Sequence, residues 1–332
     1  MFRHLTLVAV ILALVVIVLG AYTRLTDAGL GCPDWPGCYG QLLAPTHSHE
    51  IEKAEMLFPH APVESQKAWT EMIHRYFAST LGALILVLTG LAWFSKKTTP
   101  KEKGLTLTLL ALVIFQGLLG MWTVTLKLFP LVVMSHLLGG LLTLSLLWSL
   151  WHQKKQRLPS HPSSPRPWVV IGFGLLFFQI LLGGLTSANY AALSCPDFPG
   201  CTMSFFPTLD MQAFNLTGAL ALENPIQFLS LEARQTLHML HRLGAMIVLL
   251  FLLPLIVSLV RFSKNLPFDQ KGNVQSTSYL LMTLLGAQLV LGITNVVALL
   301  PLWVAVLHNF IAACLLLIMV RLFFLLPEKT PA

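Results

Sequence analysis

Histidines occur at matching positions in the two halves of this 332-residue chain. His74 and His241 are 167 residues apart, and His136 and His308 are 172 residues apart. All four stand in or beside long apolar runs, where an ionisable side chain is costly and usually marks a function. Two imidazoles from two helices of one bundle suit a haem iron, which takes one nitrogen on each face. A lone membrane histidine can simply hydrogen-bond a neighbour, but a pair that recurs in both halves favours ligation.

The residues around these histidines favour haem over zinc or copper, because no third or fourth inward ligand recurs beside them. The flanking stretches "SHLLGGL" and "HRLGAM" contain small residues that leave room for a flat macrocycle. No C-x-x-C-H sequence occurs, so we expect non-covalent haem held by two histidines.

A carboxylate distinguishes the first half from the second. Glu71 stands three residues before His74 in "EMIHR", whereas His238 holds the aligned place before His241 in "HMLHR". Residues i and i+3 share a helix face, so Glu71 is expected one turn outward of its histidine, near a haem edge. There it can accept a proton or stabilise a developing cation; the alternative is an interfacial glutamate favoured by the helix dipole. His238 could compete with His241 as the ligand, but the match to His74 favours His241.

Arginines directly follow two of the histidines. Arg75 and Arg242 could pair with haem propionates, because the guanidinium group offers a fork of hydrogen-bond donors. The alternative is that both side chains only extend toward the membrane surface.

Apolar residues dominate the elements that must position these side chains. The chain is 55% hydrophobic and 11% charged, with a mean hydropathy of +0.74, whereas soluble chains carry about 25% charged residues. We therefore expect an all-α integral membrane protein with eight transmembrane helices. The predicted spans are 5–25, 74–94, 105–126, 130–151, 168–188, 236–260, 277–299 and 301–325.

The bias of lysine and arginine toward cytoplasmic loops predicts the orientation. With the N-terminus inside, the inner segments hold 14 of the 21 basic residues, and the outer segments hold 11 of the 14 acidic residues. Both termini are then cytoplasmic. The net charge of +7 comes from short inner loops that face anionic lipid, so it requires no nucleic-acid partner.

The two halves align well beyond the histidines. The segment "LGAYTRLTDAGLGC" at 19–32 resembles "LGGLTSANYAALSC" at 182–195. We expect a tandem duplication of two four-helix bundles in the same orientation. Residues 1–151 are the predicted N-terminal bundle, the polar, proline-rich segment 152–167 is a cytoplasmic linker, and residues 168–332 are the C-terminal bundle.

Taken together, the duplicated eight-helix pattern, the "E-x-x-H-R" of the first half, "SHLLGG", "LHRLGA", "LHN" and the paired cysteine loops resemble the haem A synthase family over nearly the whole chain. Members of that family are oxidoreductases that convert the C8 methyl group of haem O to a formyl group by successive hydroxylation, with water supplying the oxygen. The resemblance implies that His74 and His136 bind substrate haem O in the first half. It implies that His241 and His308 bind a permanent haem b in the second, and that Glu71 is catalytic.

The resemblance also implies a cellular setting. We expect a multi-pass protein of the bacterial inner membrane, surrounded by lipid, that supplies haem A to a terminal oxidase. Possible partners are the protohaem farnesyltransferase that makes haem O, terminal-oxidase assembly factors, and a second copy of the chain in a homo-oligomer. The competing hypothesis is a dihaem electron carrier like cytochrome b. Such a carrier would use the histidines as haem ligands but would have no role for Glu71.

Cysteines recur as a loop in each half, "CPDWPGC" from Cys32 to Cys38 and "CPDFPGC" from Cys195 to Cys201. Both loops are expected on the outer, oxidising side, where disulfides persist, and their prolines and glycines bend the chain enough to allow closure. The main hypothesis is a structural disulfide within each loop, Cys32–Cys38 and Cys195–Cys201. Two alternatives stay open: a redox role for the first pair, and a four-thiolate zinc site shared by both loops.

The remaining histidines of the first outer loop and the last cysteine are expected to have no chemical role. His47, His49 and His60 are interpreted as solvated loop residues, and Cys314 as a small packing residue.

Overall fold

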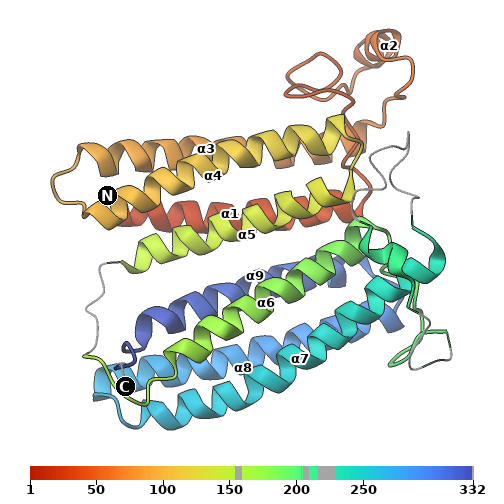
Figure 1. The fold of residues 1–332 in the computed structure, drawn as a ribbon. Helices are drawn as coiled ribbons and strands as arrows, with labels where there is room; N and C mark the ends of the chain where they lie inside the picture. The colour runs from red at the N-terminus through yellow and green to blue at the C-terminus, as the bar shows by residue number, and fades with distance from the viewer. Residues whose placement is uncertain (154–158, 203, 205–208, 216–228, 331–332) are drawn as a thin grey trace.

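The computed structural model describes residues 1–153, 159–202, 204, 209–215 and 229–330 (Figure 1). Within these residues the secondary structure is helical, apart from turns and two isolated β-bridges. Eight of the described helices are long and apolar enough to cross a membrane, which confirms the predicted all-α membrane fold. They are α1 (Phe2–Leu25), α3 (Ser65–Phe94), α4 (Pro100–Thr125), α5 (Pro130–His152), α6 (Arg166–Ala188), α7 (Leu231–Ser263), α8 (Phe268–Val297) and α9 (Leu302–Leu325).

The eight helices form two groups of four (Figure 1). In the first group α1 packs against α3 and α5, and α4 packs against the same two helices, so that α3 and α5 lie on a diagonal. In the second group α6 and α8 flank α7 and α9 in the same way. The two groups meet where α1 and α5 contact α9 and where α5 contacts α6. This arrangement is consistent with the predicted tandem duplication.

Loops and termini occupy opposite ends of the molecule. Both termini lie at one end, whereas the short helix α2 (Ser48–Leu57) and the turn of 3₁₀-helix η1 (Met211–Phe214) lie at the other (Figure 1). The cysteine loops follow α1 and α6 at this second end, which is called the outer end below.

Very short connections join the last two helices of each half. Lys127 and Leu128 precede α5, and Leu299 and Leu300 precede α9, with positive φ angles between 47° and 61°. These left-handed residues reverse the chain, so the helices on either side are antiparallel neighbours. The same backbone shape at aligned positions agrees with a duplicated unit. The other described non-glycine residues with positive φ are also aligned pairs: Asp27 with Tyr190, and Tyr39 with Thr202.

The second helix of each half begins earlier than its apolar run predicts. Helix α3 starts at Ser65 rather than at His74, because its outer turns pack against the first cysteine loop through Ala68 and Met72. Helix α7 starts at Leu231 after Ser230, whose hydroxyl accepts a hydrogen bond from the third residue of the helix. The histidines therefore lie within continuous helix rather than at its first turn.

The predicted linker lies partly outside the described residues, since 154–158 are not described. Its described end packs against the C-terminal segment: the Ser164 hydroxyl donates to the Pro327 carbonyl at 2.7 Å, and Arg166 pairs with Glu328 at 3.0 Å. The inner end of the second bundle is thus closed by contacts between the start of α6 and the chain beyond α9.

Candidate functional site

The first histidine pair faces across the diagonal of the first bundle. His74 lies on α3 and His136 on α5, and their ring centroids are 6.4 Å apart with an angle of 84° between the ring planes. Metal bonds to imidazole nitrogen are about 2 Å long, so an ion held between two facing imidazoles separates the ring centres by roughly 6 Å. The spacing therefore fits two axial ligands of one iron.

The second histidine pair occupies the corresponding helices of the second bundle. His241 lies on α7 and His308 on α9. The Gln179 amide nitrogen lies 2.9 Å from His241 Nδ1, and the Gln288 amide nitrogen lies 3.1 Å from His308 Nε2. For His308 to bind a metal through Nε2, the Gln288 amide must turn aside, whereas the Gln179 contact leaves Nε2 of His241 available.

Each of the four rings lies against a glycine of a neighbouring helix. A Cβ atom added at Gly20 of α1 would come within 3.0 Å of His74, and one at Gly183 of α6 within 2.9 Å of His241. The contact at Gly183 is shorter than real Cβ atoms show, and the contact at Gly20 is at the tight limit, so a larger residue at either place would push the ring away from the helix. The other two pairs repeat the arrangement less tightly: Gly120 with His136 at 3.5 Å, and Gly292 with His308 at 3.2 Å.

The donor set favours a haem over a bare metal ion. Nδ1 of His74, His136 and His308 makes no hydrogen bond of ordinary distance and angle, although the backbone of Val16, Gln116 and Gln288 approaches these rings. Across the described chain, no three histidine, cysteine or acidic side chains gather as a metal site. A haem supplies four ligands of its own, so two histidines are enough. The residues present fit a haem in each bundle.

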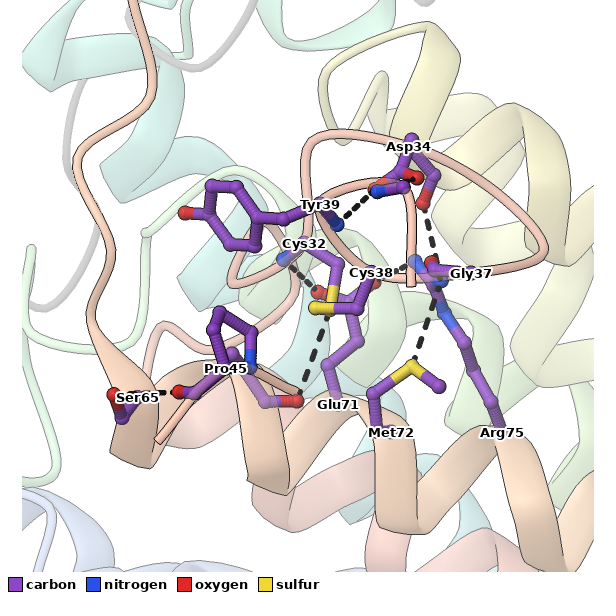
Figure 2. The surroundings of a disulfide bond; sticks show 12 residues. Cys32, Asp34, Gly37, Cys38, Tyr39, Pro45, Ser65, Glu71, Met72 and Arg75 are labelled. Atoms are coloured by element: carbon purple, nitrogen blue, oxygen red, sulfur yellow. Dashed lines mark hydrogen bonds and ion pairs between the residues drawn. A yellow bond between two sulfur atoms is a disulfide. The ribbon is translucent and has the colours of Figure 1, made fainter. Parts of the chain in front are cut away.

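Glu71 is buried at the outer end of the first bundle, with 4% of its surface exposed. It lies on α3 one turn outward of His74, as its spacing predicts. The Cys32 backbone N–H donates to Glu71 Oε2 at 2.9 Å, and Arg75 Nη2 donates to Oε1 at 2.5 Å (Figure 2). The carboxylate is thus fixed between its own helix and the first cysteine loop.

Arg75 also binds the backbone of that loop. Its Nη1 donates to the carbonyl oxygens of Gly37 at 2.5 Å and Asp34 at 3.1 Å. In the second half, Arg242 Nη1 donates to the aligned carbonyls of Gly200 and Asp197. Both guanidinium groups therefore bind cysteine loops, and pairing with haem propionates stays a prediction.

The second half replaces the carboxylate with a histidine. His238 is as buried as Glu71, with 4% exposed, and its Nδ1 has no ordinary hydrogen-bond partner. With no carboxylate there, Arg242 Nη2 donates to the Cys195 carbonyl at 2.7 Å. The same arginine scaffold thus supports a carboxylate in one bundle only.

Each cysteine loop is closed by its own disulfide, as predicted. Cys32 bonds to Cys38, and Cys195 bonds to Cys201. This pairing leaves no thiolates in the loops for a zinc site shared between them. The loops also repeat one contact with the second helix of their half, since the Cys32 and Cys195 sulfurs lie 3.8 and 3.9 Å from the carbonyls of Ala68 and Gln235.

The remaining residues singled out in the sequence are three histidines of the outer loop and one cysteine of a helix. His47 caps the start of α2 and stacks on His49 with ring centroids 5.9 Å apart. His60 is exposed, and Cys314 is a partly buried free cysteine within α9. That these residues have no chemical role stays a prediction.

Two features of the site were not predicted from the sequence: the glycines that contact the histidine rings, and Gln179. The glycines lie in segments that align between the halves, such as "LGAYTRL" and "LGGLTSA", so a search for small residues at fixed spacing from each histidine could have found them. Gln179 aligns with Val16 on the spacing of those same segments, and this difference between the halves was the available signal.

Comparisons with known proteins agree on one protein family for nearly the whole chain. The family COX15-CtaA, described as cytochrome oxidase assembly protein, matches residues 3–320. A haem A synthase of Shewanella oneidensis is 44% identical over 329 residues, covering 97% of this chain and 96% of the relative. Haem A synthases of Allorhizobium ampelinum and Caulobacter vibrioides are 28% and 29% identical and cover 90% and 93% of this chain.

Proposed function

The chain belongs to the COX15-CtaA family of cytochrome oxidase assembly proteins, and from this premise we propose that it acts as a haem A synthase with one task in each bundle. Residues 1–151 bind haem O as substrate, and residues 168–332 hold a resident haem b. The substrate reaction is oxidation of the C8 methyl group to a formyl group by successive hydroxylation. This change takes up oxygen from water and releases protons and electrons.

The residues around each histidine pair decide which haem the pair is proposed to bind. His74 and His136 are the proposed axial ligands of haem O, because Glu71 lies in their bundle. His241 and His308 are the proposed ligands of haem b, which when bound supplies a one-electron redox centre.

Glu71 carries this proposal. It is the buried carboxylate one turn outward of His74, and its aligned residue in the second bundle is His238. Oxidation of a methyl carbon requires proton transfer, and a positioned carboxylate next to the reacting group contributes about 10²–10⁴-fold to such steps. Arg75 and the Cys32 N–H hold both oxygens in place, so the carboxylate can accept a proton without reorienting.

The orientation and setting follow from the same assignment. The outer end faces the oxidising side of the bacterial inner membrane, where disulfides persist, and both termini are cytoplasmic. Arg75 and Arg242 are proposed to reach haem propionates in addition to the loop carbonyls that they bind. A farnesyltransferase that supplies haem O, terminal-oxidase assembly factors and a second copy of this chain are the proposed partners.

Identification of the haems in purified protein tests this function. The protein is produced with a haem O supply, and its haems are extracted and identified by chromatography and mass. Haem A or a hydroxylated haem O is expected in the wild type and absent in Glu71→Ala, while Glu64→Gln, an exposed carboxylate paired with Lys67, keeps it. Haem b alone under every condition would instead support the dihaem electron carrier.

A further inference from the structure

An amide with unused hydrogen-bond donors lies beside the first histidine pair. The backbone of Gln116 on α4 approaches the His136 ring, and a Cβ added at Gly120, one turn further along α4, would lie 3.5 Å from the same ring. Gln116 Nε2 is buried and has no hydrogen-bond partner among the described residues. Such atoms are rare in folded proteins, so this amide nitrogen is a candidate donor to a bound molecule.

Two glycines of α5 make room around this amide. A Cβ added at Gly139 would come within 1.9 Å of Gln116 Nε2, so the amide nitrogen takes the place that a side chain would fill. Gly139 and Gly140 follow His136 by three and four residues and share its helix face, one turn toward the inner end. A Cβ added at Gly140 would meet no other described group within 4 Å. Glycines that only let two helices pack closely have helix atoms against them, and Gly140 has none.

The second bundle fills the same position with side chains. Ile311 and Ala312 stand where α5 has its two glycines, and Ile311 is buried, with 9% exposed. Gln288, the counterpart of Gln116, places its amide nitrogen 3.1 Å from His308 Nε2. The amide thus lies against a ligand ring in the second bundle, whereas in the first bundle it lies on a glycine beside open space.

The two haems of the proposed function differ in a group that such a position can recognise. Haem O carries a hydroxyl group and a long apolar chain where haem b carries a vinyl group. An amide N–H donates to a hydroxyl oxygen. A site that offers a hydrogen bond to a substrate hydroxyl discriminates against an analogue without it, because the buried polar group of the site is then left unpaired.

We infer that Gln116 selects haem O over haem b in the first bundle by donating a hydrogen bond to the hydroxyl group of haem O, while the two glycines of α5 leave room for its apolar chain. The inference rests on the proposed function, because it requires haem O to bind between His74 and His136. It gives the inner side of this pocket a role of its own. Glu71 lies one turn outward of the histidines and acts on the substrate, and Gln116 lies one turn inward and recognises it.

Separate titrations with the two haems test the inference. Purified protein with haem b in its second bundle is titrated with haem O or with further haem b, and absorbance gives an affinity for each. Gln116→Leu removes the donor and is expected to lower the preference for haem O by about 3–10-fold, as for one neutral hydrogen bond, with the haem b affinity kept. Gly139→Ala keeps the amide but displaces it, and should lower the preference in the same direction.

Matched controls separate this effect from a general change in the helices. Ile114→Leu, at an exposed site on α4, and Gly90→Ala, at a glycine of α3 with open space around it, are expected to leave the preference for haem O unchanged.

The outcomes separate the inference from the function on which it rests. A lower preference for haem O in both variants, with the haem b affinity kept, supports the inference. An unchanged preference in Gln116→Leu would overturn it while leaving haem O ligation in place. If that variant loses affinity for both haems, the preference measured in Gly139→Ala decides. His136→Ala tests ligation separately: haem O binding as tight as in the wild type would refute the proposed haem O site itself.

Discussion

The outer ends of the two bundles share one scaffold and differ in a few side chains. Both have a disulfide-closed loop, an arginine that binds the carbonyls of that loop, and histidine rings resting on glycines. They differ at Glu71 against His238 and at Val16 against Gln179. Under the proposed function, the retained parts hold a haem between two helices, and the altered residues set its chemistry.

This comparison supports the proposed division of work between the two bundles. Where Arg75 holds a carboxylate, Arg242 uses the same nitrogen to bind the Cys195 carbonyl. The arginine therefore keeps its loop in place in both bundles, and one substitution on the preceding turn of helix adds or removes an acid. Changes at these positions should separate catalysis from haem binding.

The largest effect is expected when the first bundle is given the residue of the second. Glu71→His should lower haem A formation by about 10²–10⁴-fold, because the proposed proton acceptor is lost while both histidine pairs remain. Turnover is measured by chromatography of extracted haems. The reciprocal His238→Glu should leave turnover near the wild-type value, and strong activity in Glu71→His would contradict the division of labour.

A side chain at the glycine beneath a ring should remove one haem selectively. Gly183→Val should weaken haem b binding by about 10–100-fold, the usual cost of displacing a metal ligand from its support, and Gly20→Val should weaken only haem O binding. Absorbance of the purified protein and extraction of its haems measure both. Gly174→Val, at a site on α6 with open space around it, controls for the added side chain, and equal loss in all three variants would show a general folding defect.

Loss of the first disulfide should affect the reaction more than loss of the second. Cys32→Ala with Cys38→Ala frees a loop whose closure is worth about 2 kcal/mol by chain entropy, and the Cys32 N–H that holds Glu71 moves with it. A misplaced catalytic group can cost up to about 10²-fold in rate. Turnover per bound haem b should therefore fall. In contrast, Cys195→Ala with Cys201→Ala should preserve it, and unchanged turnover in both variants would exclude any catalytic need for the loops.

The smallest effect concerns the contact between the bundles at the outer end. Arg24 Nη2 donates to the Ser187 carbonyl at 2.6 Å, and its guanidinium lies 4.0 Å above the Tyr190 ring. Arg24→Ala should destabilise the detergent-solubilised protein by about 1 kcal/mol through loss of these contacts. A thermal melt followed by haem absorbance measures it, with Thr26→Ala as control, because the Thr26 hydroxyl bonds only to carbonyls of its own helix. Equal melting temperatures would show that this contact does not hold the bundles together.

Much of the fold was predictable because its signals are local. Apolar runs predicted all eight spans, and Pro130, the first residue of α5, and Pro301, directly before α9, marked two helix starts. The start of α3 was predicted too late, since the turns from Ser65 to Met72 are not apolar and are held in helix by the cysteine loop. An amphipathic extension stabilised by a distant loop has no hydropathy signal of its own.

The sequence by itself determined the spacing of the histidine pairs and the Glu71 asymmetry, because residues at the same place in two aligned halves are expected at the same place in the fold. It favoured a disulfide within each cysteine loop, and the structure has both. Only the tertiary structure decided what each side chain touches. The Cys32 N–H reaches Glu71 across 39 residues, and the Gln179 amide reaches His241 across 62 residues. Such contacts depend on the rotation of each helix and on the path of each loop, and these are set by packing between segments far apart in the chain.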